Sequence, residues 1–594
     1  MHHPHRDIDL RVDLEATMRD GTVLRADVYR PAGSGPWPVL LARTPYGKQD
    51  PGVLARLDPV AAARRGYLVV VQDCRGRFRS DGHWQPLVHE GADGFDTVAW
   101  AARLPGADGR VGMYGPSYLG HTQRAAMAAH PPQLHAAVPE LTWADPHNGL
   151  LSRGGALELG LLTHWTLTLG FNVLERRHAD RPAELRRHLP LLNSALDNLA
   201  THTYWELPAH DLPTVRRLGL PAPAVPRPHS AAHVTAPPAA KARRPERAVP
   251  TLTVAGWFDC FLQGSLDNHL DARRSGAPAA LIVGPWTHSD QGRLIGDTDF
   301  GPGADAAAID GGASLLVRQL DWLDRHLPRG APPAPAPVPS AAEPPVLLFV
   351  MGVNRWHRLE SWPPRSTGLS WYLHTDGTLS RGLPAPDAPP GVFRHDPNDP
   401  VPTRGGALLM APEYPAGPVD QHDVEQRADV LVYTSEPLDA PLEVIGRVRV
   451  HLAADSTAPT TDWIARLCDV TPDGVSCNVT DGILRTSPAF PAANGPPPPP
   501  EHRIDLWSTA HVFLPGHRIR LQVASSCFPR WDRNPGCHDS APDDGVLPAA
   551  RQTVHHDAAR PSRLVLPVTQ LRAPALPVHA PRTDPTVGGS AHAD

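Results

Sequence analysis

The feature that most constrains the fold is a series of short apolar runs between residues 37 and 288, separated by segments of helical pattern. The runs cover residues 37–47, 66–76, 109–115, 134–142, 250–259 and 279–288. Strands that are apolar along their whole length are typical of a parallel sheet that helices cover on both faces. The intervening helices supply the crossovers that parallel strands need. The series therefore predicts an α/β domain.

Two departures from this series refine the prediction. Residues 16–31 alternate apolar and polar side chains around Asp20-Gly21, which predicts an antiparallel hairpin at the sheet edge. Between residues 143 and 245 the strand series stops, and helical patterns are followed by a proline-rich stretch. We interpret this segment as a helical cap inserted into the α/β domain.

The chain changes character after a second stretch rich in proline and alanine, at residues 329–345. Beyond it, short alternating segments separated by turn residues predict an all-β domain with two packed sheets. We therefore expect the α/β domain at 1–142 and 246–328, the cap at 143–245, the β domain at 345–575 and a tail at 576–594.

Composition argues against several function classes. The net charge of the 594 residues is −6, without a basic patch, so we expect no nucleic-acid partner. No apolar stretch approaches the ~18 residues of a membrane span, and the N-terminus lacks the apolar core of a signal peptide. We therefore expect a cytoplasmic protein without a membrane partner. The six cysteines show no zinc-type spacing, so we expect neither a metal nor a cofactor.

Ser117 lies in the segment GPSYLG, between an apolar run and a helical pattern. This segment nearly matches the nucleophile elbow G-x-S-x-G, but its second glycine, Gly120, comes one residue late. A serine alone in such a position is more commonly a helix cap than a nucleophile. A catalytic serine needs a histidine base and an acid, which follow it in the order Ser, Asp, His in α/β-hydrolases. Asp259 and His288 end later apolar runs in that order, so the three residues together predict a catalytic triad.

The segment GRVGMYGPSYLG (109–120) resembles the G-x-S-Y-x-G elbow of the cocaine-esterase-like (CocE/NonD) serine hydrolases, in which the late glycine is the norm. That family is related to X-Pro dipeptidyl-peptidases and α-amino-acid ester hydrolases. The stretches MRDGTVLRADVYRP, QDCRGRFRSDG, GWFD and GPWTH agree, and the similarity covers roughly residues 10–575. The resemblance implies an α/β-hydrolase domain, a helical cap and a C-terminal jelly-roll sandwich.

The resemblance also implies roles for individual residues. Ser117 would be the nucleophile, His288 the general base and acid, and Asp259 the residue that orients His288. The oxyanion hole would consist of the hydroxyl of Tyr46 and the backbone N–H of Tyr118. A phenol is a hydrogen-bond donor that can meet a developing alkoxide, so the chemistry supports this assignment.

The substrate is less constrained than the reaction. Trp165 and Phe261 fall where the family places the aromatic side chains of the acyl pocket, which favours an apolar or aromatic acyl group. We therefore expect a serine hydrolase that cleaves small carboxylic esters through an acyl-enzyme, and a homodimer is compatible with the resemblance.

Other functions stay open at this point. An acylase or amidase, an α-amino-acid ester hydrolase and an X-Pro dipeptidyl-peptidase-like enzyme would share the triad. A substrate α-amine would need a carboxylate, which the residues after Asp259 do not offer but Glu158 of the cap could supply. A binding protein built on a decayed hydrolase is an alternative from another class.

Overall fold

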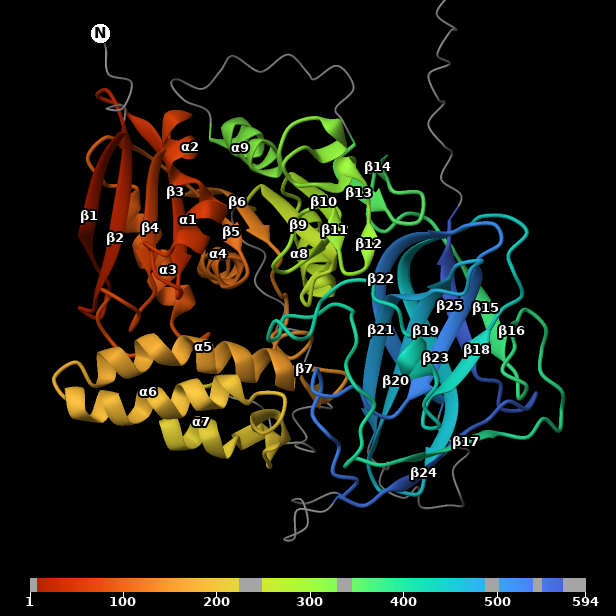
Figure 1. Cartoon of the computed structure of the whole chain (residues 1–594). Helices are drawn as coiled ribbons and strands as arrows, with labels where there is room; N and C mark the ends of the chain where they lie inside the picture. Colours follow the sequence, from red (N-terminus) through yellow and green to blue (C-terminus); the bar gives the residue numbers. More distant parts are fainter. Residues whose placement is uncertain (1–7, 224–247, 328–343, 487–500, 538–546, 570–594) are drawn as a thin grey trace, which may run out of the picture.

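The computed structural model describes residues 8–223, 248–327, 344–486, 501–537 and 547–569 of the chain. Figure 1 shows three parts: an α/β domain coloured from red to green, a layer of helices beneath it, and a β domain coloured from cyan to blue. The predicted tail at 576–594 and most of the two proline-rich stretches lie outside the described residues.

A ten-stranded sheet forms the centre of the α/β domain, in the order β1-β2-β4-β3-β5-β6-β9-β10-β13-β14. Its strands are β1 (Ile8–Thr17), β2 (Val23–Pro31), β3 (Trp37–Thr44), β4 (Leu68–Asp73), β5 (Ala107–Pro116), β6 (Leu134–Glu140), β9 (Thr251–Phe258), β10 (Ala279–Thr287), β13 (Val346–Val350) and β14 (Arg355–Leu359). The six apolar runs form the parallel strands β3, β4, β5, β6, β9 and β10. Strands β3, β4 and β9 are buried at every residue, which confirms the prediction of a doubly covered sheet.

One edge of this sheet agrees with the prediction from the sequence, and the other edge differs from it. At one edge, β1 and β2 form the predicted antiparallel hairpin. At the other edge, β13 pairs in parallel with β10, and β14 pairs antiparallel with β13. Residues 346–359 therefore complete the α/β sheet, although the sequence assigns them to the β domain. A local apolar pattern specifies a strand but not the sheet that the strand joins, so the domain bounds themselves stay predictions.

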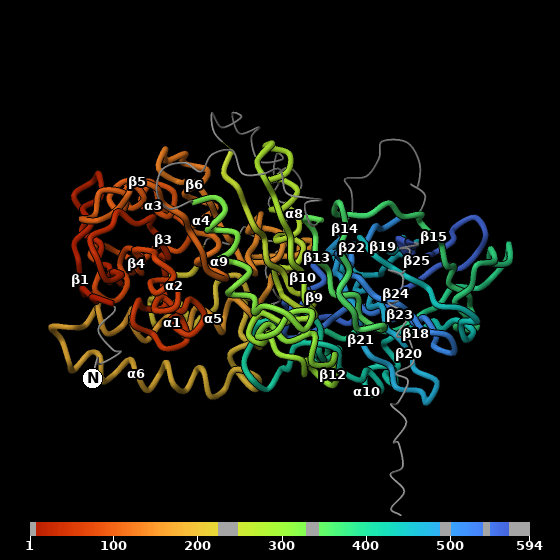
Figure 2. The backbone as a smooth tube through the Cα atoms, turned by 90° about the horizontal axis from the view of Figure 1, so that it is seen from above, coloured from red at the N-terminus to blue at the C-terminus, as the bar shows by residue number. Residues whose placement is uncertain are grey.

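Helices pack on both faces of the sheet (Figure 2). One face packs against α1 (Pro51–Leu57), α2 (Pro59–Arg64) and α9 (Leu315–His326), and the other against α3 (Glu90–Ala101) and α4 (Tyr118–Ala129). Successive residues of a strand point to opposite faces of the sheet. Leu40 belongs to the apolar cluster on the first face, and Leu41 belongs to the cluster on the second face. This alternation is the two-residue period of a strand with both faces buried. Helix α8 (Leu262–Arg274) packs against β9.

Most of the helices in the layer below the sheet in Figure 1 belong to the insertion between β6 and β9. Its elements are β7 (Ser152–Arg153), β8 (Ala156–Leu157), α5 (Leu159–Arg177), α6 (Pro182–Asp197), η1 (Thr203–Trp205), η2 (Ala209–Asp211) and α7 (Pro213–Leu218). Between β10 and α9 lie β11 (Leu294–Ile295), β12 (Thr298–Asp299), η4 (Pro302–Ala304) and η5 (Ile309–Gly311). Helix α5 lies closest to the sheet and faces the ends of its parallel strands.

The β domain contains a seven-stranded sheet, β16-β15-β25-β19-β24-β17 with β22 paired to β19, and a four-stranded sheet, β18-β23-β20-β21. Its elements are β15 (Thr367–Leu373), β16 (Leu379–Ser380), β17 (Gly391–His395), α10 (His422–Glu425), β18 (Leu431–Thr434), β19 (Leu442–Ser456), β20 (Thr461–Val470), β21 (Ser476–Thr486), β22 (Glu501–Phe513), β23 (Arg518–Ala524), β24 (Ala550–Val554) and β25 (Arg563–Val568). The predicted two-sheet β domain is therefore confirmed. One apolar cluster joins Trp257 of β9 to Trp507 of β22, so the two domains share a core.

Candidate active site

Ser117 occupies the sharp turn between β5 and α4. Its backbone has φ +60° and ψ −125°, a conformation that costs a non-glycine residue of order 1–3 kcal/mol. Gly115 has φ +125°, which favours glycine, and a Cβ atom there would lie 2.9 Å from Leu119. The turn is thus a strained elbow, and Ser117 lines a cavity of about 510 Å³.

The late glycine of the elbow has a packing reason. A Cβ atom at Gly120 would lie 2.8 Å from the side chain of Thr142 and 3.2 Å from the carbonyl oxygen of Glu140. Glycine at this position lets the first turn of α4 approach the segment that follows β6. The backbone N–H of Ser117 also donates to the Glu140 carbonyl oxygen at 2.9 Å, which fixes the elbow to the neighbouring strand.

Asp259 and His288 follow the adjacent strands β9 and β10 and form a close pair. Nδ1 of His288 lies 2.7 Å from Oδ1 of Asp259. With the proton on Nδ1, donated to this carboxylate, Nε2 is left as a base. The Asp259 side chain is 0% exposed and that of His288 is 11% exposed, so solvent reaches only the imidazole. Because β5, β6, β9 and β10 are neighbours, the ends of their strands bring Ser117 and this pair to one edge of the sheet.

Tyr46 follows β3, and its hydroxyl lies close enough to the Ser117 side chain for the serine to influence the pKa of the phenol. Nε1–H of Trp165 donates to the same hydroxyl at 3.3 Å. Burial raises the pKa of Tyr46 above its usual value, so the phenol keeps its proton at neutral pH and can act as a donor. The structure therefore places a phenolic O–H directly beside the strained serine.

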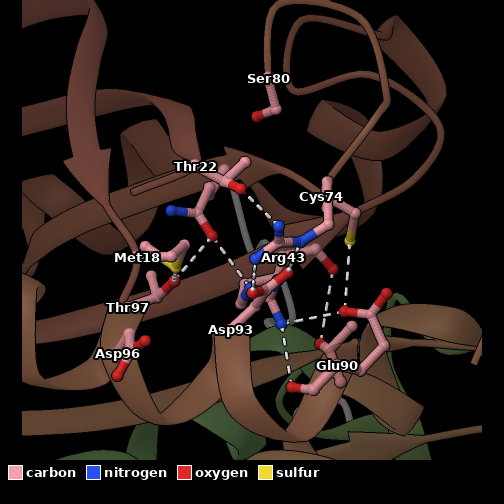
Figure 3. Close-up of polar contacts among 12 residues, drawn as sticks. Met18, Thr22, Arg43, Cys74, Ser80, Glu90, Asp93, Asp96 and Thr97 are labelled. Carbon is pink, nitrogen blue, oxygen red and sulfur yellow. Dashed lines mark hydrogen bonds and ion pairs between the residues drawn. The ribbon is translucent and has the colours of Figure 1, made fainter. Parts of the chain in front are cut away.

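The backbone N–H of Tyr118 is a second donor at the elbow, because the first N–H groups of a helix have no intrahelical acceptor. The Tyr118 side chain is buried, and its hydroxyl donates to Oε1 of Glu90 at 2.9 Å and accepts the N–H of Leu87 at 2.9 Å. Figure 3 shows Glu90 in turn against Arg43, at 2.9 Å, with Asp93 close by. A buried ion pair therefore anchors the residue that follows Ser117.

The sequence analysis did not identify Arg43 and Glu90. Arg43 donates to Oε1 of Gln72 at 2.9 Å, and Asp93 lies 3.8 Å from its guanidinium. One signal was present: Arg43 is a charged residue inside an apolar run that must be buried on both faces. A buried arginine requires acidic partners, but the sequence does not indicate which ones.

Trp165 and Phe261, the residues expected at the acyl pocket, lie near the site. Trp165 stacks on the Tyr118 ring at 6.1 Å between centroids, and Phe261 contacts the His288 ring edge-on at 5.1 Å. Neither residue is part of the wall of the cavity at Ser117. The apolar part of that wall includes Val53, Phe78, Pro116, Leu119, Leu169 and Phe171. A role for Trp165 and Phe261 in acyl binding stays a prediction.

The strained serine, the Asp–His pair on neighbouring strands and the adjacent phenol are features of an α/β-hydrolase of the serine type. Residues 20–290 match the family described as X-Pro dipeptidyl-peptidase (S15 family). Residues 340–565 match the X-Pro dipeptidyl-peptidase C-terminal non-catalytic domain. Cocaine esterase from Rhodococcus sp. (strain MB1 Bresler) is 35% identical over 582 residues, which cover 93% of this chain and 97% of that protein.

Two solved structures are similar over their whole length. An aminopeptidase from a marine-sediment Thaumarchaeota archaeon has a TM-score of 0.71 at 25% identity, covering 95% of this chain and 96% of its own. An α-amino acid ester hydrolase has a TM-score of 0.70 at 25% identity, covering 96% and 98%. The chain belongs to the cocaine-esterase-like serine hydrolases of the S15 family, and it is a serine ester hydrolase.

Proposed function

We propose that this enzyme cleaves small carboxylic esters through an acyl-enzyme formed on Ser117. The observation that carries the proposal is the 2.7 Å contact between His288 and Asp259 at the strand ends beside the strained Ser117. Nε2 of His288 takes the Oγ proton of Ser117 as Oγ attacks the ester carbonyl carbon. His288 then gives this proton to the leaving alcohol, and water hydrolyses the acyl-enzyme by the same steps. Asp259 keeps the imidazole in the required tautomer.

The tetrahedral intermediate places a negative charge on the former carbonyl oxygen. The O–H of Tyr46 and the N–H of Tyr118 are two donors next to the serine, which supports their assignment as the oxyanion hole. Because Tyr46 is held by Trp165 and Tyr118 by Glu90, the donors are ordered before the substrate binds.

The surroundings of Ser117 favour an apolar or aromatic acyl group. Glu158, the cap carboxylate that could have met a substrate ammonium, is 4% exposed. It accepts Nε1–H of Trp531 at 2.9 Å and lies 3.9 Å from Arg530. Its charge is thus already balanced. The carboxylates in the cavity wall at Ser117, Asp50 and Glu175, are exposed. These positions support an ester hydrolase over an α-amino-acid-specific enzyme.

A fluorophosphonate probe tests the nucleophile. We expect the probe to label the purified protein at Ser117, and Ser117→Ala to lose both labelling and the hydrolysis of p-nitrophenyl esters. Ser152→Ala, at a buried serine of β7, is a matched control that should keep both. Turnover retained by Ser117→Ala would refute the proposal.

The leaving group is tested by measuring kcat/KM on matched esters and amides, with and without an α-amino group. We expect the unsubstituted ester to be the better substrate in each pair. A strong preference for α-amino acyl groups or for amides would instead favour the α-amino-acid ester hydrolase or the acylase.

None of the helices in the described residues is long and apolar enough to cross a membrane. The cytoplasmic location and the homodimer stay predictions. Light scattering on the purified full chain decides the oligomeric state, and cell fractionation decides the location.

A further inference from the structure

A thiol that no step of ester hydrolysis uses lies against the acid of the catalytic pair. Cys260 follows Asp259 directly and is 4% exposed. Its Sγ atom lies 3.7 Å from Oδ1 of Asp259, the same oxygen that His288 contacts at 2.7 Å. One sulfur, one imidazole nitrogen and one carboxylate oxygen thus lie within 4.8 Å of one another.

The carboxylate of Asp259 can accept a further hydrogen bond or bind a cation. Its second oxygen, Oδ2, is buried and has no hydrogen-bond partner among the described residues. A buried acceptor without a partner is unfavourable. A divalent ion held by this carboxylate can be bound through Oδ2 as well as through Oδ1, and its binding would then satisfy the unpartnered oxygen.

We propose that Asp259, Cys260 and His288 form an inhibitory site for a soft divalent metal ion such as Cd²⁺ or Zn²⁺. Zinc bonds of about 2.0–2.3 Å in a tetrahedral site hold the ligand atoms roughly 3.3–3.8 Å apart. The distance of 3.7 Å between Sγ of Cys260 and Oδ1 of Asp259 already fits this requirement. The contact of 2.7 Å between His288 and Asp259 is shorter than this, so it has to lengthen when the ion binds.

Metal binding at this site exchanges protons for the ion. The S–H bond of Cys260 breaks, a metal–sulfur bond forms, and the thiol proton goes to solvent. The metal also replaces the proton on Nδ1 of His288, and Nε2 takes up one proton from solvent, so the imidazole stays neutral. No electron is transferred. Because Nε2 then carries a proton, His288 can no longer accept the proton of Ser117, and acylation stops.

The environment of the thiol selects the kind of metal. A buried thiol favours a metal ion with high sulfur affinity, because such an ion can displace the thiol proton. Mg²⁺ and Ca²⁺ prefer oxygen ligands and should not compete. His288 is the most exposed of the three ligands, at 11% of its side chain, so we expect the ion to enter past its imidazole and inhibition to develop slowly.

The first experiment measures p-nitrophenyl ester hydrolysis by the full chain after incubation with CdCl₂, relative to the metal-free rate of each variant. We expect time-dependent inhibition that EDTA reverses and that Mg²⁺ does not cause. In Cys260→Ser the Cd²⁺ concentration for half inhibition should rise at least about tenfold. Cys74→Ser is the matched control, because Cys74 is a buried thiol 3.7 Å from the carboxylate of Glu90 and should leave the sensitivity unchanged. Equal sensitivity of Cys260→Ser and the unmodified protein would overturn the proposal.

The second experiment does not depend on activity. The inhibition measured in the first experiment depends on the proposed catalytic roles of Ser117 and His288, whereas the binding of the metal ion does not. In Ser117→Ala, titration with CdCl₂ should produce the ultraviolet charge-transfer band of a cadmium thiolate, and the band should be missing from Ser117→Ala/Cys260→Ser. A band that persists in the double variant, or no band in either, overturns the metal site. Loss of esterase activity without metal would bear only on the proposed function.

Discussion

At the carboxyl ends of the parallel strands, each predicted catalytic residue lies within two residues of its own strand. By contrast, four buried charges where the cap meets the β domain come from distant parts of the chain. Arg153 contacts Asp481 across 328 residues, and Glu158 contacts Trp531 across 373. We call the first region the strand-end site, and it comprises Tyr46, Ser117, Asp259 and His288. We call the second region the cap junction, and it comprises Arg153, Glu158, Asp481 and Arg530.

The cap junction is a buried cluster of charges. Arg530 lies 2.8 Å from Asp481 and 3.9 Å from Glu158, and Arg153 lies 3.5 Å from Asp481. Arg466, just outside this set, also lies 4.0 Å from Asp481, so each buried carboxylate has at least one guanidinium beside it. The strand-end site instead keeps a strained backbone and an imidazole open to solvent. We therefore expect the strand-end site to perform the chemistry and the cap junction to fix the cap over it.

The largest expected effect is on the catalytic acid. Asp259→Asn should lower kcat by about 10⁴-fold, because an amide can stabilise the wrong tautomer of His288 and cannot offset its charge. The melting temperature should change little in comparison. Asp290→Asn, in the loop after His288, is the matched control and should keep near-normal turnover. A small loss of kcat in Asp259→Asn would mean that the strand-end site does not act as a triad.

The next effect tests the oxyanion hole. Tyr46→Phe should lower kcat by about 10²–10³-fold with little change in KM, because the donor acts on charge that develops in the transition state. Tyr114→Phe makes the same chemical change at a buried tyrosine whose hydroxyl has no hydrogen-bond partner among the described residues, and its kcat should be unchanged. If both variants keep full turnover, another donor meets the oxyanion.

At the cap junction the expected effect is on stability. Arg530→Met removes a buried partner of Asp481 and Glu158, and the free energy of unfolding should fall by about 3–5 kcal/mol. The exposed pair of Arg216 and Asp211, at 2.9 Å, is the control, and Arg216→Met should cost at most about 1 kcal/mol. Chemical denaturation followed by fluorescence measures both. A loss of kcat in Arg530→Met without a loss of stability would show that the junction takes part in catalysis.

The smallest effect concerns pH. Burial alone would raise the pKa of Asp481, but Arg530, Arg153 and Arg466 outweigh it and hold the pKa below 3.8. A lowered pKa contributes stability that is fully present above the unfolded value and is lost as the pH falls through the folded value. The gap in unfolding free energy between the unmodified protein and Asp481→Asn should therefore stay constant near neutral pH and narrow below about pH 4. A gap that widens in acid would contradict this sign.

Much of the strand-end site could be predicted from the sequence, because each of its residues is placed by the pattern of the few residues around it. The apolar runs specify the strands, the glycines around Ser117 specify a sharp turn, and a residue that follows a parallel strand must lie at the shared edge of the sheet. Asp259 and His288 therefore come together without any knowledge of side-chain packing. The predicted edge hairpin at residues 16–31 has the same local origin.

Other features needed the tertiary structure. The sequence does not show that residues 346–359 extend the α/β sheet, that Glu90 holds Tyr118, or that Trp165 donates to Tyr46. Each depends on which partner a strand or side chain meets after the layers have packed, and a local pattern carries no such information.

The chain by itself thus determined the parallel strands, the order of the three predicted triad residues and the class of chemistry, because strand and turn propensities act over a few residues. Only the tertiary structure decided that the carboxylate of Glu158 is buried beside Arg530. It alone also showed that the thiol of Cys260 lies against the catalytic carboxylate. Both depend on burial, and burial is set by the packing of the whole molecule.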